Sequence, residues 1–147
     1  MRRDYPDRPF LGVGAIVIHD NRVLLVRRAN PPLQGEWSIP GGLVETGETT
    51  RDAIVREVLE ETALRVEVAA LVEVFERILR DNQSRVQYHY VLLDYRCCVA
   101  SGEAYAGSDV SEVRWVTLDE LELLSVAPET CAVIRKAVDS AANKSEL

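Results

Sequence analysis

The segment "TTRDAIVREVLEETA", residues 49–63, constrains the fold of this 147-residue chain more than any other stretch. Its apolar residues recur with the period of an α-helix and fall on one side of it at about 100° per residue. Three glutamates fall on the other side: Glu57, Glu60 and Glu61. Thr49 and Asp52 mark the start, since a threonine followed three residues later by an acid fits a capping box. The sequence therefore predicts an amphipathic helix with a carboxylate face.

Length and composition favour one globular domain covering residues 1–147. Hydrophobic residues make up 47% and charged residues 28% of the chain, which is typical of a folded protein. The apolar run at residues 11–18 is too short for a membrane span, and the first ten residues lack the layout of a signal peptide. We therefore expect a cytoplasmic protein without a membrane partner.

Charge and cysteine content exclude several classes of function. The net charge of -7 argues against non-specific binding to nucleic acid, which needs a basic patch. The three cysteines include no C-x-x-C pair, so neither a disulfide framework nor a zinc site is predicted. We interpret His89 as structural, because a lone histidine in an alternating strand more often satisfies a local hydrogen bond than acts on a substrate.

Apolar runs separated by polar breaks predict a mixed α/β fold. The predicted strands are residues 12–18, 22–28, 65–79, 86–99 and 112–118. A second helix is predicted over residues 128–142 and a short helical turn over residues 118–124. A proline- and glycine-rich segment, residues 31–48, precedes the first helix, and its length and apolar residues favour a functional loop.

The spacing of the glutamates decides between a solvated acidic face and a functional one. Reading from Gly42, "GLVETGETTRDAIVREVLEETAL" resembles the Nudix hydrolase signature G-x5-E-x7-R-E-U-x-E-E-x-G-U, in which U is a bulky apolar residue. The matching residues are Gly42, Glu48, Arg56, Glu57, Val58, Glu60, Glu61 and Leu64. A chance match to the six single-residue positions is of order one in ten million per starting point. Ala63 stands where the signature has its last glycine. We expect it to close the helix in a left-handed conformation, with a helical Ala63 as the alternative.

The resemblance covers nearly the whole chain and implies an α/β/α sandwich with a mixed central sheet, with the signature at residues 42–64. It also implies a metal site, because carboxylate oxygens suit Mg²⁺ or Mn²⁺, which also grip the phosphates of a substrate. The expected metal ligands are Glu57, Glu60, Glu61 and the backbone carbonyl of Gly41. Arg56 is expected to pair with Glu48 and fix the loop to the helix, with an exposed surface charge as the alternative.

The implied reaction is metal-dependent hydrolysis of the diphosphate linkage in a nucleoside diphosphate joined to another group. Glu60, Glu61 and Arg56 are expected to serve catalysis. Family members often take a general base from the loop before the last strand, where Asp109 is the first choice and Glu112 the second. Two solvated loop acids are the alternative interpretation.

ADP-ribose is the favoured substrate, giving AMP and ribose 5-phosphate, because residues 12–49 look much like a compact bacterial group often assigned to this reaction. The proline that marks many ADP-ribose hydrolases is missing. Arg27 and Arg28 are expected near the loop, where one of them would meet a phosphate. Trp37 is expected to offer a stacking surface for a nucleoside. A solvated strand end and a core position are the respective alternatives.

Two other functions stay open. One is a pyrophosphohydrolase that removes damaged, oxidised nucleoside triphosphates and releases pyrophosphate. The other is a noncatalytic nucleotide sensor, against which the intact glutamates and the lack of length for a helix-turn-helix domain argue. The sequence does not set the oligomeric state, and the resemblance suggests a homodimer because small enzymes of this family are often dimers.

Overall fold

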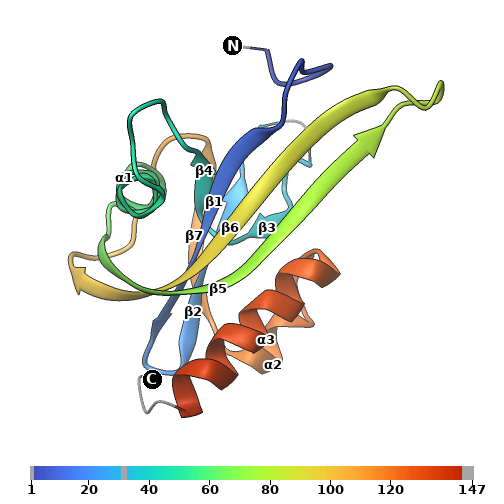
Figure 1. The fold of residues 1–147 in the computed structure, drawn as a ribbon. Helices are drawn as coiled ribbons and strands as arrows, with labels where there is room; N and C mark the ends of the chain where they lie inside the picture. The colour runs from blue at the N-terminus through green and yellow to red at the C-terminus, as the bar shows by residue number, and fades with distance from the viewer. Residues whose placement is uncertain (1, 31–32, 144–147) are drawn as a thin grey trace.

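A mixed β-sheet lies between helices in the computed structural model, which describes residues 2–30 and 33–143. The elements are β1 (Phe10–His19), β2 (Arg22–Arg28), β3 (Trp37–Ser38), β4 (Gly41–Leu43), α1 (Thr50–Thr62), β5 (Arg65–Arg80), β6 (Val86–Ser101), β7 (Val110–Val116), α2 (Leu118–Leu121) and α3 (Pro128–Asn143). Helix α1 covers one side of the strands, and α2 with α3 lies on the other (Figure 1). The predicted α/β/α sandwich is confirmed.

The sheet mixes parallel and antiparallel pairs. Its main path runs β3-β2-β1-β6-β5, with β4 paired to β1 and β7 paired to β2. β1 runs parallel to β6, and the other strand pairs are antiparallel. The β1–β2 turn has positive φ at both Asp20 (51°) and Asn21 (60°), as a tight hairpin turn requires.

Two hydrophobic clusters fill the two faces of the sheet. Val13, Ala15 and Val17 of β1 pack with the buried face of α1, while Ile16 and Ile18 pack on the side of α3. Successive side chains of a strand point to opposite faces, so β1 contributes to both clusters. Burial on both faces explains why its sequence is continuously apolar instead of alternating.

The structure adds two short strands that the sequence pattern did not indicate. β3 and β4 lie inside the predicted loop and exist because they pair with β2 and β1. β7 begins two residues earlier and ends two residues earlier than predicted, because Thr117 serves as the N-cap of α2. No helix in the described ranges is long and apolar enough to cross a membrane.

Candidate active site

Helix α1 carries the candidate site and has defined ends. The side chain of Thr49 accepts a hydrogen bond from the Asp52 backbone N–H at 3.0 Å, which caps the first turn. At the other end Ala63 is left-handed (φ 65°), and its N–H donates to the Leu59 carbonyl at 3.0 Å. The predicted left-handed closure at Ala63 is confirmed. Ile54 and Val58 are fully buried, which turns the glutamates away from the core.

Arg56 ties the loop before α1 to the helix. Its Nε donates to Glu48 Oε2 at 2.7 Å and its Nη2 donates to the Leu43 carbonyl at 3.0 Å. Its Nη1 donates to Glu57 Oε1 at 2.8 Å. The hydrogen bonds from Arg56 hold the pKa of Glu48 at about 2, so this carboxylate stays charged. The predicted pairing of Arg56 with Glu48 is observed.

Glu61 is bound to the strand that leads into the loop. The Gly41 backbone N–H donates to Glu61 Oε1 at 2.8 Å. Burial raises the pKa of Glu61 to about 7 against this hydrogen bond, and the negative charges of Glu57 and Asp109 raise it further, whereas the positive charge of Arg28 lowers it. The site therefore concentrates negative charge in a poorly solvated place, where a cation would be favoured.

Gly42 leaves the space that the Glu57 carboxylate occupies. A Cβ atom at residue 42 would stand 2.4 Å from the carboxyl carbon of Glu57, closer than two unbonded carbons approach. Burial raises the pKa of Glu57, although the hydrogen bond from Arg56 opposes this rise. The glycine of the signature thus has a steric reason: the loop backbone and the helix carboxylate lie against each other.

The loop before β7 caps the C-terminal end of α1. The N–H groups of Tyr105, Gly107 and Ser108 donate to the carbonyls of Thr62, Glu61 and Glu60 at 2.8, 2.8 and 3.2 Å. The last carbonyls of a helix lack partners inside the helix, so these contacts satisfy them. A Cβ atom at Gly107 would stand 1.9 Å from the Glu60 carbonyl oxygen, so only glycine allows this approach.

This docking brings Asp109 to the carboxylate face. The Asp109 carbonyl accepts from the Ala29 N–H at 3.1 Å, and its Oδ1 accepts from Asn30 Nδ2 at 3.1 Å. Asp109 therefore lies between the end of β2 and α1, where its charge acts on Glu61. Asn30 and Gly107 were not predicted from the sequence. For Asn30 the sequence holds no signal, and for Gly107 the only signal is a glycine in the loop that carries the candidate acids.

Two of the predicted site residues, Glu112 and Arg27, lie away from the glutamates. Glu112 stands opposite Arg27 in the β2–β7 pair, and its carboxylate is 3.9 Å from Arg27 and 3.1 Å from Arg114. Arg27 also donates to the Gly35 carbonyl at 3.0 Å. These contacts hold Glu112 and Arg27 at the β2–β7 seam, whereas Asp109 and Arg28 act on Glu61.

The structure corrects the stacking role predicted for Trp37. This residue is only 5% exposed and belongs to the hydrophobic cluster on the α3 side. The guanidinium groups of Arg27 and Arg114 lie over its ring, 5.8 and 5.1 Å from the centroid. An indole this deeply buried has no open face for a nucleoside, so the alternative of a core position holds.

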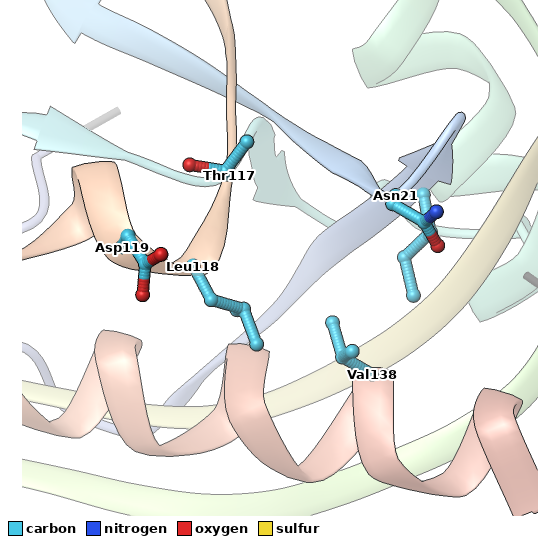
Figure 2. A pocket seen from close by; sticks show the side chains of 6 residues that line it. Asn21, Thr117, Leu118, Asp119 and Val138 are labelled. Carbon is cyan, nitrogen blue, oxygen red and sulfur yellow. The ribbon is translucent and has the colours of Figure 1, made fainter.

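Two pockets of the surface lie away from these carboxylates. A pocket of about 340 Å³ opens between the β1–β2 turn, the start of α2 and α3 (Figure 2). It is lined by Ile18, Asn21, Thr117, Leu118, Asp119 and Val138. Another, of about 450 Å³, lies beside Arg27, Gly35 and Ser125. Neither pocket is lined by a residue of α1.

The donor set fits a divalent metal ion. Oxygen donors of the kind that Mg²⁺ and Mn²⁺ prefer share one face of α1, next to the backbone of Gly41. Among residues 2–30 and 33–143, no three acidic, histidine or cysteine side chains already stand together around one point. Arg56 donates to Glu57 and Glu60, and the Gly41 N–H donates to Glu61. Binding an ion would therefore require these side chains to turn toward it.

Comparison with known proteins decides the family. A family model described as the NUDIX domain matches residues 8–137. The chain belongs to the Nudix family. Nudix hydrolases act on the pyrophosphate linkages of small nucleotide substrates and generally use divalent metal ions. The chain is thus a Nudix hydrolase, and its signature residues are those gathered around α1.

Individual Nudix relatives support this assignment. The chain is 38% identical over 117 residues to an ADP-ribose pyrophosphatase of Methanocaldococcus jannaschii, covering 80% of this chain and 67% of that protein. It is 31% identical over 117 residues to a Bacillus subtilis protein named as a candidate 8-oxo-dGTP diphosphatase, covering 78% and 71%. A crystal structure of a MutT NUDIX hydrolase from Burkholderia pseudomallei has a TM-score of 0.78 at 30% identity, covering 88% of this chain and 98% of that one. The chain spans about two thirds of the length of the first two relatives.

Proposed function

We propose that this Nudix hydrolase cleaves ADP-ribose into AMP and ribose 5-phosphate. The observation that carries this choice is the 38% identity over 117 residues to the archaeal ADP-ribose pyrophosphatase. In the proposed reaction water adds to one phosphorus, and the bridging oxygen leaves with the other phosphate. Both products then carry a phosphate monoester, which a product assay can identify.

The proposal assigns the metal to Glu57, Glu60, Glu61 and the carbonyl of Gly41. A bound Mg²⁺ or Mn²⁺ supplies charge for the phosphates and makes water a better nucleophile. Burial and mutual repulsion of the glutamates support a cation here, because both raise the pKa of Glu61. Arg56 fixes the loop relative to the carboxylates of α1 through its hydrogen bonds to Glu48 and Glu57.

Asp109 is proposed to accept the proton of the attacking water. Its position beside α1 supports this role, whereas Glu112 is held by two arginines at the β2–β7 seam. Arg28 is proposed to contact a substrate phosphate, because its charge already acts on Glu61. Activity should fall in Asp109→Asn and stay near the parent value in Glu112→Gln, and the reverse result would move the base to Glu112.

A second candidate is hydrolysis of an oxidised nucleoside triphosphate to a monophosphate and pyrophosphate. The identity of 31% to the Bacillus subtilis protein favours it as the alternative. The noncatalytic sensor is disfavoured, because the chain retains the paired Arg56 and Glu48 beside the full set of glutamates. The cytoplasmic location and the homodimer expected from the sequence stay predictions, which cell fractionation and a mass measurement test.

One experiment separates these functions. The purified chain is incubated with Mg²⁺ and, separately, ADP-ribose, NADH, diadenosine polyphosphates, sugar nucleotides and native or oxidised triphosphates, and products are resolved by chromatography. We expect the highest kcat/KM for ADP-ribose. Equal values for all of these compounds would mean that the enzyme recognises only the diphosphate that they share. A clear preference for an oxidised triphosphate moves the assignment to the second candidate, and tight binding without hydrolysis moves it to the sensor. The Glu61→Gln variant controls for contaminating hydrolases.

A further inference from the structure

Asn30 stands at the end of β2, beside the loop that carries Asp109. Its amide nitrogen Nδ2 donates to Asp109 Oδ1 at 3.1 Å. The two residues are 79 positions apart in the sequence, so only the folded chain brings them together. Both are exposed, and water therefore reaches the carboxylate that Asn30 contacts. The pair lies at the surface of the candidate site and not inside the core.

The backbone around this contact is fixed by the pairing of β2 with β7. The register of the pair shifts between Arg27 and Arg28, and Arg28 lies opposite Val110. Beyond this bulge the Ala29 N–H donates to the Asp109 carbonyl at 3.1 Å, and Asp109 has a left-handed backbone conformation (φ 59°). Bulges of this kind re-aim side chains next to active sites. The main chain thus fixes the Cα atom of Asp109 and leaves the direction of its carboxylate to side-chain contacts.

One hydrogen bond sets the direction of the Asp109 carboxylate. Within residues 2–30 and 33–143, Asn30 is the only residue that donates to this side chain, and Oδ2 accepts no hydrogen bond. Ordering a side chain costs entropy, which a contact made before the reaction supplies in advance. A general base must also present a free oxygen within hydrogen-bond reach of the proton that it accepts. Asn30 meets both needs, because it holds Oδ1 and leaves Oδ2 for the water.

The partner of Asp109 is a neutral amide, which suits a group that must accept a proton. A cation within about 4 to 6 Å of a carboxylate favours the charged form by attraction, an effect that a neutral amide lacks. Glu112, three residues further on, shows the contrast, because its carboxylate lies 3.9 Å from Arg27 and 3.1 Å from Arg114. The two acids of this segment therefore have chemically different partners: Asn30 orients Asp109 without adding a positive charge, whereas two guanidinium groups hold Glu112.

We propose that Asn30 is a positioning residue, which orients the carboxylate of Asp109 toward the attacking water. This role rests on Asp109 serving as the base, as proposed above. It does not depend on which nucleotide is cleaved, because Asp109 meets the water and not the nucleoside. Two other roles for Asn30 make different predictions. Direct contact with the substrate would appear in KM, and a purely structural role would appear in folding and not in kcat.

The first test measures kcat and KM of Asn30→Ala with Mg²⁺ and ADP-ribose, or with the compound of the panel above that gives the highest kcat/KM. We expect kcat to fall about tenfold, a part of the roughly 100- to 10,000-fold that a general base contributes. KM should stay within about threefold of the wild-type value, because binding is not affected. Asn82→Ala, the same substitution at an exposed asparagine in the β5–β6 turn, should leave both constants unchanged. Circular dichroism should show the same helix content in all of these proteins.

A double-mutant cycle shows whether Asn30 acts through Asp109. In the Asp109→Ala background, Asn30→Ala should change kcat by less than about twofold, because no carboxylate remains to be oriented. Asn30→Asp has the shape of asparagine, lacks the donor and sets a second negative charge against Asp109. We therefore expect its kcat to fall at least as far as that of Asn30→Ala.

Several results would overturn the proposal. Equal losses of kcat from Asn30→Ala in the wild-type and Asp109→Ala backgrounds would show that Asn30 acts without Asp109. A higher KM at constant kcat would mark direct contact with the substrate, and wild-type kcat in Asn30→Ala or Asn30→Asp would show that no orientation is needed.

Failure of the proposed function gives a different pattern. Hydrolysis of a compound other than ADP-ribose changes the substrate and leaves the role of Asn30 intact, since the cycle is then measured with that compound. Full activity in Asp109→Ala removes the base and the positioning role together, and so does the lack of hydrolysis of every compound. Loss of kcat in Asp109→Ala but not in Asn30→Ala overturns the positioning role alone.

Discussion

Arg56 grips Glu48 at two points: Nε donates to Oε2 at 2.7 Å and Nη2 to Oε1 at 2.9 Å. This two-point contact sets the distance and the angle between the loop and α1, because the guanidinium is a rigid planar fork. A lysine would keep the charge and lose the fork. The pairing of Arg56 with Glu48 therefore positions the glutamates that follow Arg56 on α1 relative to the loop.

Arg56→Lys should lower kcat/KM about 10- to 100-fold, the usual effect of losing a residue that orients metal ligands. Far-ultraviolet circular dichroism should show unchanged helix content. Arg51→Lys is the matched control on the same helix, since Arg51 is exposed and contacts β5 instead of the glutamates. Full activity in Arg56→Lys would show that charge alone positions the glutamates.

Glu61→Gln should abolish nearly all Mg²⁺- or Mn²⁺-dependent hydrolysis without unfolding the protein. The amide oxygen can still accept from the Gly41 N–H, while the loss of charge removes a ligand and its repulsion with Glu57. Thermal unfolding with and without Mg²⁺ checks this. The ion should raise the Tm of the wild type and of Glu103→Gln, an exposed acid that is not one of the proposed ligands, and should leave the Tm of Glu61→Gln unchanged. Activity of the wild type in excess chelator would contradict the metal assignment.

Ala63→Gly should raise the free energy of unfolding by up to about 1 kcal/mol, with turnover little changed. Ala63 is held at φ 65°, a region that costs an alanine energy and a glycine almost none. The greater freedom of glycine in the unfolded chain offsets part of this gain. The urea midpoint measures the net effect, and a lower midpoint would mean that the unfolded-state term is the larger one.

Gly107→Ala should weaken both activity and stability. The added Cβ would meet the Glu60 carbonyl oxygen at 1.9 Å, so the loop must lift from the end of α1 and take Asp109 with it. Forcing atoms into occupied space typically costs about 1 to 3 kcal/mol. Ser108→Ala, which keeps the neighbouring N–H bond to Glu60, is the control. Parent-like kinetics in Gly107→Ala would show that docking of the loop is not needed for hydrolysis.

Asp94→Asn should change the pH dependence of stability. Asp94 is 4% exposed, and burial together with the charge of Glu73 raises its pKa to about 6, with Arg77 opposing the rise. The folded protein therefore binds this proton more tightly than the unfolded chain, whose value is 3.8. The stabilisation from this group is complete below about pH 4 and is lost as the pH rises through about 6, amounting to roughly 3 kcal/mol. Asn cannot titrate, so the variant should be more stable than the wild type at pH 8 and not at pH 4. Urea unfolding at both pH values measures this. An equal difference in the free energy of unfolding at both pH values would contradict the prediction.

Local signals in the sequence predicted α1 to within a residue at each end. The repeat of apolar residues, the cap at Thr49 and the left-handed position at Ala63 are all contained in one continuous segment. The same holds for β2, which matches its predicted range, and for the contact between Arg56 and Glu48, eight residues apart. Short-range geometry determines such features, because a helix or hairpin sets the relative positions of nearby residues by itself.

Only the tertiary structure decided what lies beside the glutamates. Asp109 reaches α1 because Gly107 lets a distant loop bond to the helix end, and Glu112, three residues away in the sequence, is turned to Arg27 instead. The sequence leaves Trp37 open between a stacking surface and a core position, and the structure pairs β3 with β2 and buries Trp37 in the core. Composition and spacing establish which chemical groups are available, whereas strand pairing and packing over long sequence separations determine which of them meet.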